Sequence, residues 1–92
     1  MDAVNQLVEK INDWAERLLL KGLAKLDERD IEEIHGFMES AKDLDMMFLV
    51  RILEGMATEG RRYVMDSQTV IDGVVQKYFY LCQYVQLVEE KG

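Results

Sequence analysis

Residues 67–90 read SQTVIDGVVQKYFYLCQYVQLVEE, and the only charged side chain between Asp72 and Glu89 is that of Lys77. Steps of three and four residues separate the members of an apolar stripe, which is typical of a helix packed against a neighbour. The stripe consists of Ile71, Val74, Tyr78, Leu81, Val85 and Val88, and it is widened by Val75, Phe79 and Cys82. We therefore predict a final helix from Ser67 to Glu90 with a broad buried face.

The same helix has a second apolar side. Tyr80, Tyr84 and Leu87 project away from the first stripe. The polar residues that remain form a narrow line: Asp72, Gln76, Gln83 and Gln86. So much apolar surface needs a cover, supplied either by the other helices of this chain or by a second chain.

Two more helices are expected in the first half of the chain. Helical spacing of apolar residues runs from Asp2 to Lys21, and Gly22 should weaken the end of this helix before a short segment over 23–26. The second helix is predicted from Glu28 to Lys42, because Asp27 can cap the amide of Asp30. Few residues of this helix are expected to be buried, so it should lie on the outside of the bundle. The expected buried line consists of Ile31, Ile34, Met38 and Ala41, with Phe37 beside it.

A third helix is predicted to begin after a cap at Asp43 or Asp45 and to end near Gly60. Its first turns, residues 46–50, are apolar on nearly all sides, which predicts burial on more than one side. Asp66 or Ser67 would cap the last helix. No segment has the alternation of a half-buried strand. The sequence thus predicts an all-α single domain over 1–92, a compact and mostly antiparallel four-helix bundle.

Composition favours a soluble cytoplasmic protein. The chain has 92 residues, of which 49% are hydrophobic and 32% charged, so one core is expected without disulfides or metal. No apolar run reaches the ~20 residues that a membrane helix needs. The N-terminus lacks the pattern of a signal peptide, and a single cysteine permits no disulfide within the chain.

The formal charge of -7 is concentrated in one region. From Asp27 to Asp45 there are eight acidic residues against Arg29 and Lys42, which argues against direct nucleic-acid binding. The acidic face predicted here consists of Asp27, Glu28, Asp30, Glu32, Glu33 and Glu39. Two interpretations remain open: a solvated helix face, or a surface that docks on a basic partner.

Candidate metal and nucleophile residues are few. Glu32 and His35 have the Glu-x-x-His spacing of di-iron bundles, but the single histidine allows such a site only in a symmetric dimer. Cys82 has only His35 as a possible base, and on an apolar helix face its thiol is expected to behave as a small hydrophobe. We expect no enzymatic activity, no cofactor and no metal.

Phosphate and nucleic-acid motifs are also lacking. Arg61, Arg62 and Tyr63 contain the only adjacent basic pair, far below the basic patch of a nucleic-acid-binding domain. Gly55 and Gly60 do not have the spacing of a phosphate-binding loop.

The spacing of leucines and other apolar residues in the first half of the chain has a recognisable pattern. Trp14 is followed by Leu18, Leu19, Gly22, Leu23 and Leu26, and then by Ile31, Ile34, Ala41, Leu44, Leu49 and Leu53. This spacing over Trp14 to Met56 resembles the helical segment that accompanies bacterial SWIM zinc-finger proteins. The zinc ligands of that family are absent, because the chain has one cysteine and one histidine. The resemblance implies a helical accessory module that works by contact.

The sequence therefore favours a non-enzymatic helical module for protein–protein interaction or oligomerisation, acting as a homo-oligomer or on a protein partner. The predicted interface residues are Tyr80, Tyr84, Leu87, Met46 and Met47. Methionines at helical spacing can instead be core filler. Two alternatives remain: a small acidic inhibitor of the phage type that docks on a basic nucleic-acid-binding partner, and a ligand or metal site within the bundle.

Overall fold

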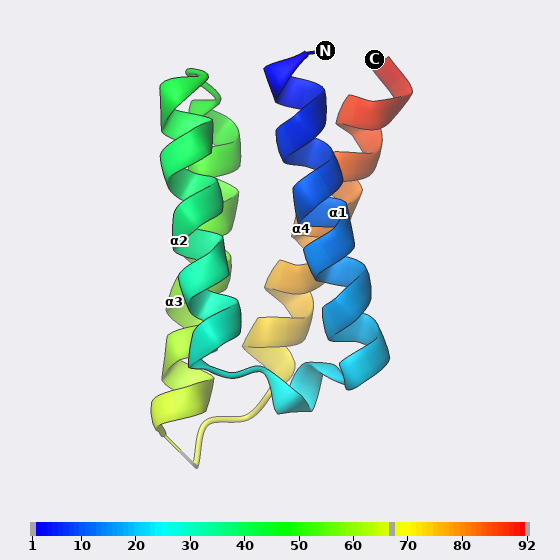
Figure 1. The fold of residues 1–92 in the computed structure, drawn as a ribbon. Coiled ribbons are helices and arrows are strands. Elements are labelled where there is room, and N and C mark those ends of the chain that lie inside the picture. The colour runs from blue at the N-terminus through cyan, green and yellow to red at the C-terminus, as the bar shows by residue number, and fades with distance from the viewer. Residues whose placement is uncertain (1, 67, 92) are drawn as a thin grey trace.

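A computed structural model describes residues 2–66 and 68–91, with side chains through residue 89. Four helices and one short 3-10 turn follow one another: α1 (Ala3–Lys21), η1 (Leu23–Lys25), α2 (Glu28–Asp43), α3 (Met47–Met65) and α4 (Asp72–Lys91). The described residues contain no strand. The helices run alternately down and up, and the two termini lie at the same end (Figure 1). The predicted all-α, antiparallel four-helix bundle is confirmed.

The helices pack around the bundle in sequence order. α2 lies against α3, α3 against α4 and α4 against α1, whereas the contact between α1 and α2 is smaller (Figure 1). The molecule measures 42 × 23 × 19 Å. None of the helices in the described part of the chain has the length and apolar content needed to cross a bilayer.

Every helix contributes to one core. The largest fully buried side chains are those of Trp14, Ile11, Leu18, Ile34, Leu49, Leu53, Met56 and Leu81. The Trp14 indole donates a hydrogen bond to the Asp30 carbonyl at 3.2 Å and packs edge-on against Phe37. The Tyr78 hydroxyl donates to the Ala15 carbonyl at 2.7 Å. These two bonds satisfy the polar ends of buried aromatic side chains and tie α1 to α2 and to α4.

The starts of α1 and α2 follow the local capping signals. Asp2 accepts a hydrogen bond from the Val4 amide at 3.0 Å. Asp27 and Asp30 form a reciprocal capping box, each carboxylate accepting from the other residue's amide at 3.0 Å. The backbone bond thus formed to Asp27, together with the Lys21 ammonium, lowers the pKa of the Asp27 carboxyl. The predicted cap is confirmed, and α2 extends one residue beyond the predicted end.

The predicted cap of α3 is wrong. Its N-cap residue is Met46, which makes no side-chain cap hydrogen bond. The Met46 amide instead donates to the Ala41 carbonyl at 2.9 Å and the Asp45 amide to the Lys42 carbonyl at 3.0 Å. These are the two hydrogen bonds of a Schellman motif, with Asp45 in the left-handed position at φ 59°. Asp45 therefore ends α2 and is not available to start α3.

The predicted end of α3 at Gly60 is also wrong, because this glycine is buried inside the helix. A Cβ at position 60 would lie 2.9 Å from Leu26 Cδ2 and 3.5 Å from Ile31 Cγ1. The absence of a side chain lets α3 approach the start of α2, and the helix continues to Met65.

The predicted start of α4 lies too early. Asp66 is the C-cap of α3, and its carboxylate accepts from the Gln68 amide at 2.9 Å. This local turn replaces the predicted N-cap, while Ser67 lies outside the described residues. The helix begins at Asp72.

Candidate interaction surface

The apolar stripe of α4 is buried as predicted. Val74, Tyr78, Leu81 and Val85 lie in the core, while Ile71 and Val88 are partly buried against it. Phe79, which was expected to widen this stripe, is instead 57% exposed. Position 79 lies toward the outward side of α4, on the flank opposite α3, and the rest of the chain leaves more than half of its side chain in solvent.

The second apolar side of α4 is not covered by the rest of the chain. Tyr80 is 49% exposed and Leu87 is 58% exposed. Tyr84 is partly buried because its ring packs against Phe48 of α3, with ring centroids 5.5 Å apart. The final helix is thus a half-exposed member of the bundle, and its outward face meets solvent.

The start of α3 extends this exposed region. Met47 and Phe48 are 54% and 53% exposed, which corrects the prediction that the first turns of α3 are buried on more than one side. Of the predicted interface residues, Met46 packs against the core and is only partly exposed. Met47 is exposed on α3 itself, whereas Phe48 contacts α4. We define the α3–α4 surface as Phe48 together with the exposed or half-exposed apolar residues of α4: Phe79, Tyr80, Tyr84 and Leu87.

The sequence predicted Tyr80, Tyr84 and Leu87 as interface residues and missed Phe48 and Phe79, while Met47 is exposed on α3. The position of Phe48 in the helical pattern could have indicated its exposure. Phe48 lies four residues before Ile52, whose side chain is buried at the contact with α4. This spacing places Phe48 at the edge of the buried face of α3 rather than at its centre. No comparable signal separated Phe79 from the core.

The surface is almost free of charge. Outward positions of α4 between its first turn and Val88 carry amides among the apolar side chains: Gln76, Gln83 and Gln86. Two cations lie at its edge: Arg51 of α3, and Lys77, whose Cδ lies 3.5 Å from the point where a Cβ of Gly55 would stand. With Phe48, Ile52, Gly55 and Tyr80, these two cations line a shallow hollow of about 170 Å³. The hollow lies where the two helices meet.

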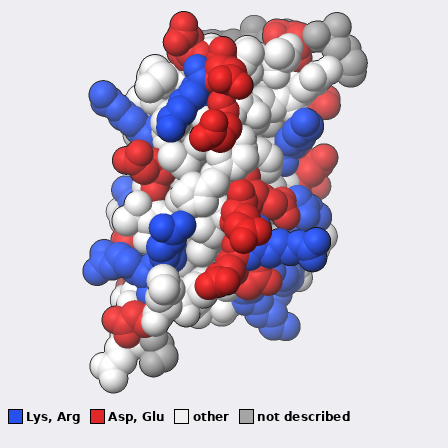
Figure 2. Space-filling view, turned by 60° about the vertical axis from the view of Figure 1, so that its left-hand side comes forward, with Lys and Arg blue, Asp and Glu red and all other residues white. Residues whose placement is uncertain are grey.

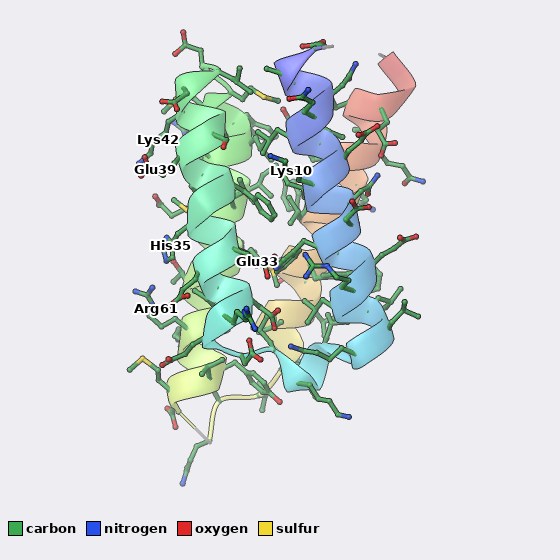
Figure 3. The ribbon with its side chains drawn as sticks, in the orientation of Figure 1. Lys10, Glu33, His35, Glu39, Lys42 and Arg61 are labelled. Carbon is green, nitrogen blue, oxygen red and sulfur yellow. The ribbon has the colours of Figure 1, made fainter. Side chains whose placement is uncertain are left out.

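The predicted acidic face is divided by the fold. Asp27 and Asp30 contact the Lys21 ammonium at 3.3 and 2.7 Å, and Glu33 contacts Arg17 at 2.9 Å. These pairs raise the pKa of both cations, chiefly through the hydrogen bonds that Arg17 donates to Glu33 and that Lys21 donates to Asp30. Glu33 points toward α1, whereas Glu39 lies on the far side of α2 (Figure 3). Half of the predicted acidic residues therefore hold α1 and α2 together.

A groove between α2 and α3 contains the Glu32 and His35 pair. An Arg61 N–H donates to His35 Nε2 at 2.9 Å, and this contact separates hollows of about 490 and 320 Å³. The floor is apolar, with Met38 and Ala57, and Figure 2 shows side chains of both charges on this side of the molecule. Arg61 occupies one of the two imidazole nitrogens through which His35 could bind a metal. Among the described residues no three acidic, histidine or cysteine side chains gather as a metal site.

The thiol and the imidazole belong to different parts of the bundle. Cys82 borders a hollow beside α1 with Asn12, Gln86 and Glu89, whereas His35 lines the α2–α3 groove. Burial raises the pKa of the Cys82 thiol, so little thiolate forms at neutral pH. The structure does not bring these two residues together as a dyad.

The other two residues of the Arg61, Arg62 and Tyr63 segment also have structural contacts. Arg62 pairs with Glu59 at 3.2 Å within α3, and the Tyr63 hydroxyl donates to the Ala24 carbonyl at 3.2 Å. The latter bond fastens η1 to α3. Neither contact forms part of a basic patch.

No family model, curated protein or solved structure matches the chain. The resemblance to the segment that accompanies SWIM zinc-finger proteins stays a prediction.

Proposed function

We propose that this protein is a non-enzymatic interaction module, and that the α3–α4 surface is where it binds another protein. One observation carries the proposal: large apolar side chains from two helices stand half-exposed on a surface that is nearly free of charge. The cores of protein interfaces are rich in aromatic residues and methionine and poor in charge. In a chain with 32% charged residues, such a surface is a local exception.

The exposed apolar side chains can contribute favourable free energy to binding. An aromatic side chain buries ~150–250 Å² in full, so a half-exposed ring has about 100 Å² left to bury. At ~25 cal/mol per Å², each such side chain contributes about 2.5 kcal/mol toward the cost of association. Tyr80 and Phe48 bring rigid rings and lose little entropy on binding.

The two alternative functions have less support. An acidic inhibitor needs free carboxylates, but Asp27, Asp30 and Glu33 are engaged with cations of α1. A ligand site in the α2–α3 groove would have to displace the contact between His35 and Arg61. We also propose a cytoplasmic location, which suits a free thiol at Cys82.

Site-specific photo-cross-linking in the cells that make the protein tests the proposal without knowledge of the partner. Leu87 is replaced by a photoreactive benzoyl-phenylalanine, and the matched control carries the same group in place of Leu20, which is 88% exposed at the end of α1. A discrete adduct from position 87, and none from position 20, is the expected result. If position 87 gives no adduct, or the same adducts as position 20, the proposed function is wrong.

A further inference from the structure

We propose that the protein bound at the α3–α4 surface is a second copy of this chain, with the two α4 helices packed antiparallel about a two-fold axis near residues 81 and 82. This inference rests on the proposed function and names its partner. It follows from three features of α4: the spacing of its outward residues, their lack of charge, and the area they expose.

The outward stripe of α4 is symmetric about its own centre. Gln76, Tyr80, Gln83 and Leu87 follow one another in steps of four, three and four residues. When two such helices run antiparallel with their centres together, Tyr80 of one copy lies opposite Gln83 of the other. Gln76 then lies opposite Leu87. This is the pairing of an antiparallel coiled coil, in which each position of the seam meets its complement.

The residues beside this stripe can also contact the equivalent flank of a second copy without a clash of charge. In an antiparallel pair each flank of a helix meets the same flank of its copy. On the flank near α3, Tyr84 of one copy comes within two residues, about 3 Å along the helix axis, of the level of Lys77 of the other, so an ammonium can reach an aromatic ring. On the opposite flank, Phe79 lies at the same small offset from Gln86. No acidic side chain is brought against another in the central three turns.

The distribution of charge favours contact between the outward faces of two α4 helices over contact between α4 and another face of a second copy. The chain has a net charge of -7, and the outward faces of α1 and α2 are rich in charged side chains, such as Glu9, Glu16, Glu28 and Glu32. Burying those faces against an uncharged surface would strip water from unpaired carboxylates. Joining two copies through α4 leaves these charges in solvent and far from the axis.

The exposed area suits a dimer of ordinary size. Four apolar side chains of the surface are about half-exposed, namely Phe48, Phe79, Tyr80 and Leu87. At about 100 Å² each, they supply roughly 400 Å² of apolar area per copy, to which the partly buried Tyr84 adds. A standard interface buries ~800 Å² on each partner, of which ~56–65% is apolar. The glutamines of α4 supply polar area.

Disulfide trapping tests this arrangement. In a Cys82→Ala background, a tagged Tyr80→Cys chain is mixed with an untagged Gln83→Cys chain and oxidised. The mixed disulfide is expected to form several-fold faster than either homodimeric disulfide, because residue 80 of one copy faces residue 83 of the other and neither residue faces its own equivalent. Two controls replace the untagged chain: Gln76→Cys, one turn or more out of register, and Glu9→Cys, on the outward face of α1.

The molar mass of the unmodified protein completes the test. A mass of twice 10.7 kDa together with the preferred 80–83 disulfide supports the inference. A dimer whose 80–83 disulfide forms no faster than that of the Glu9→Cys control overturns the α4 pairing. A monomer at all concentrations overturns the second copy as partner. In that case a cross-link from Leu87 to a chain of another mass would still uphold the proposed function, so the two failures are distinguishable.

Discussion

Gly60 shows how one missing side chain sets the packing of two helices. Leu26 and Ile31 occupy the space that a Cβ at this position would need, with the nearest carbon at 2.9 Å. The loss of helix propensity relative to alanine, about 1 kcal/mol, is the cost of this close approach.

The substitution Gly60→Ala is expected to destabilise the fold by up to about 2 kcal/mol, since ~1–3 kcal/mol of overpacking outweighs a gain in helix propensity of about 1 kcal/mol. Gly36 is the matched control, because it lies in the middle of α2 with no atom within 4 Å of its Cβ position. Gly36→Ala should stabilise the protein by about 0.5–1 kcal/mol. Urea unfolding of both variants measures the two signs. Stabilisation by Gly60→Ala would contradict the packing described here.

Asp45 illustrates a residue under local backbone strain. Its φ of 59° is left-handed, a conformation that costs a non-glycine residue about 1 kcal/mol or more. We expect Asp45→Gly to raise the stability by about 0.5–1 kcal/mol, because glycine adopts this position of the Schellman motif freely. Asp43→Gly, inside the last turn of α2, should lower it. Thermal unfolding of the pair checks both directions, and an unstable Asp45→Gly protein would argue against this turn.

Tyr78 joins stability to pH at the alkaline end. Burial, and next the neighbouring Cys82, raises the pKa of Tyr78 to about 12 from 10.0. Between these values the unfolded chain releases the phenolic proton and the folded chain keeps it, so stability falls as pH rises from 10 to 12. Tyr78→Phe should lower the free energy of unfolding by about 1 kcal/mol at pH 7, because the hydrogen bond to Ala15 is lost. Above pH 10 the free energy of unfolding of this variant should fall less steeply with pH than that of the unmodified protein. Equal slopes for both proteins would refute the assignment.

At the scale of the helix, the features that depend on residues close together in the sequence could be predicted. The starts of α1 and α2 follow from Asp2 and Asp27, whose carboxylates bind amides two or three residues ahead. The buried stripe of α4 follows from spacing alone. Such features need no knowledge of what a helix packs against.

The boundaries that failed depend on contacts from other parts of the chain. Gly60 has the sequence context of a helix end, but Leu26 and Ile31, some 30 residues earlier, make it an interior packing site. Asp45 could cap the next helix, but the motif that ends α2 holds it in a left-handed conformation. Local signals allowed both outcomes, and tertiary packing decided between them.

At the scale of the whole molecule, α4 has an exposed side because its neighbouring helices cannot cover its whole circumference. Two neighbours, α1 and α3, can shield only part of a helix that is apolar on most of its circumference. The sequence showed this surplus through Tyr80 and Leu87. It could not show that Phe48 would stand beside Tyr84, because that contact joins residues 36 positions apart and depends on the register of α3 on α4.

The molar mass in solution, measured by light scattering over a wide range of concentrations, tests the central claim most directly. The account predicts twice 10.7 kDa for the unmodified protein and for the matched surface control Leu20→Glu. It predicts a folded monomer for Leu87→Glu, because two carboxylates would enter the pair of α4 helices without partners. A Leu87→Glu protein that kept the mass of the unmodified dimer, or an unmodified protein of 10.7 kDa throughout, would contradict self-association through α4.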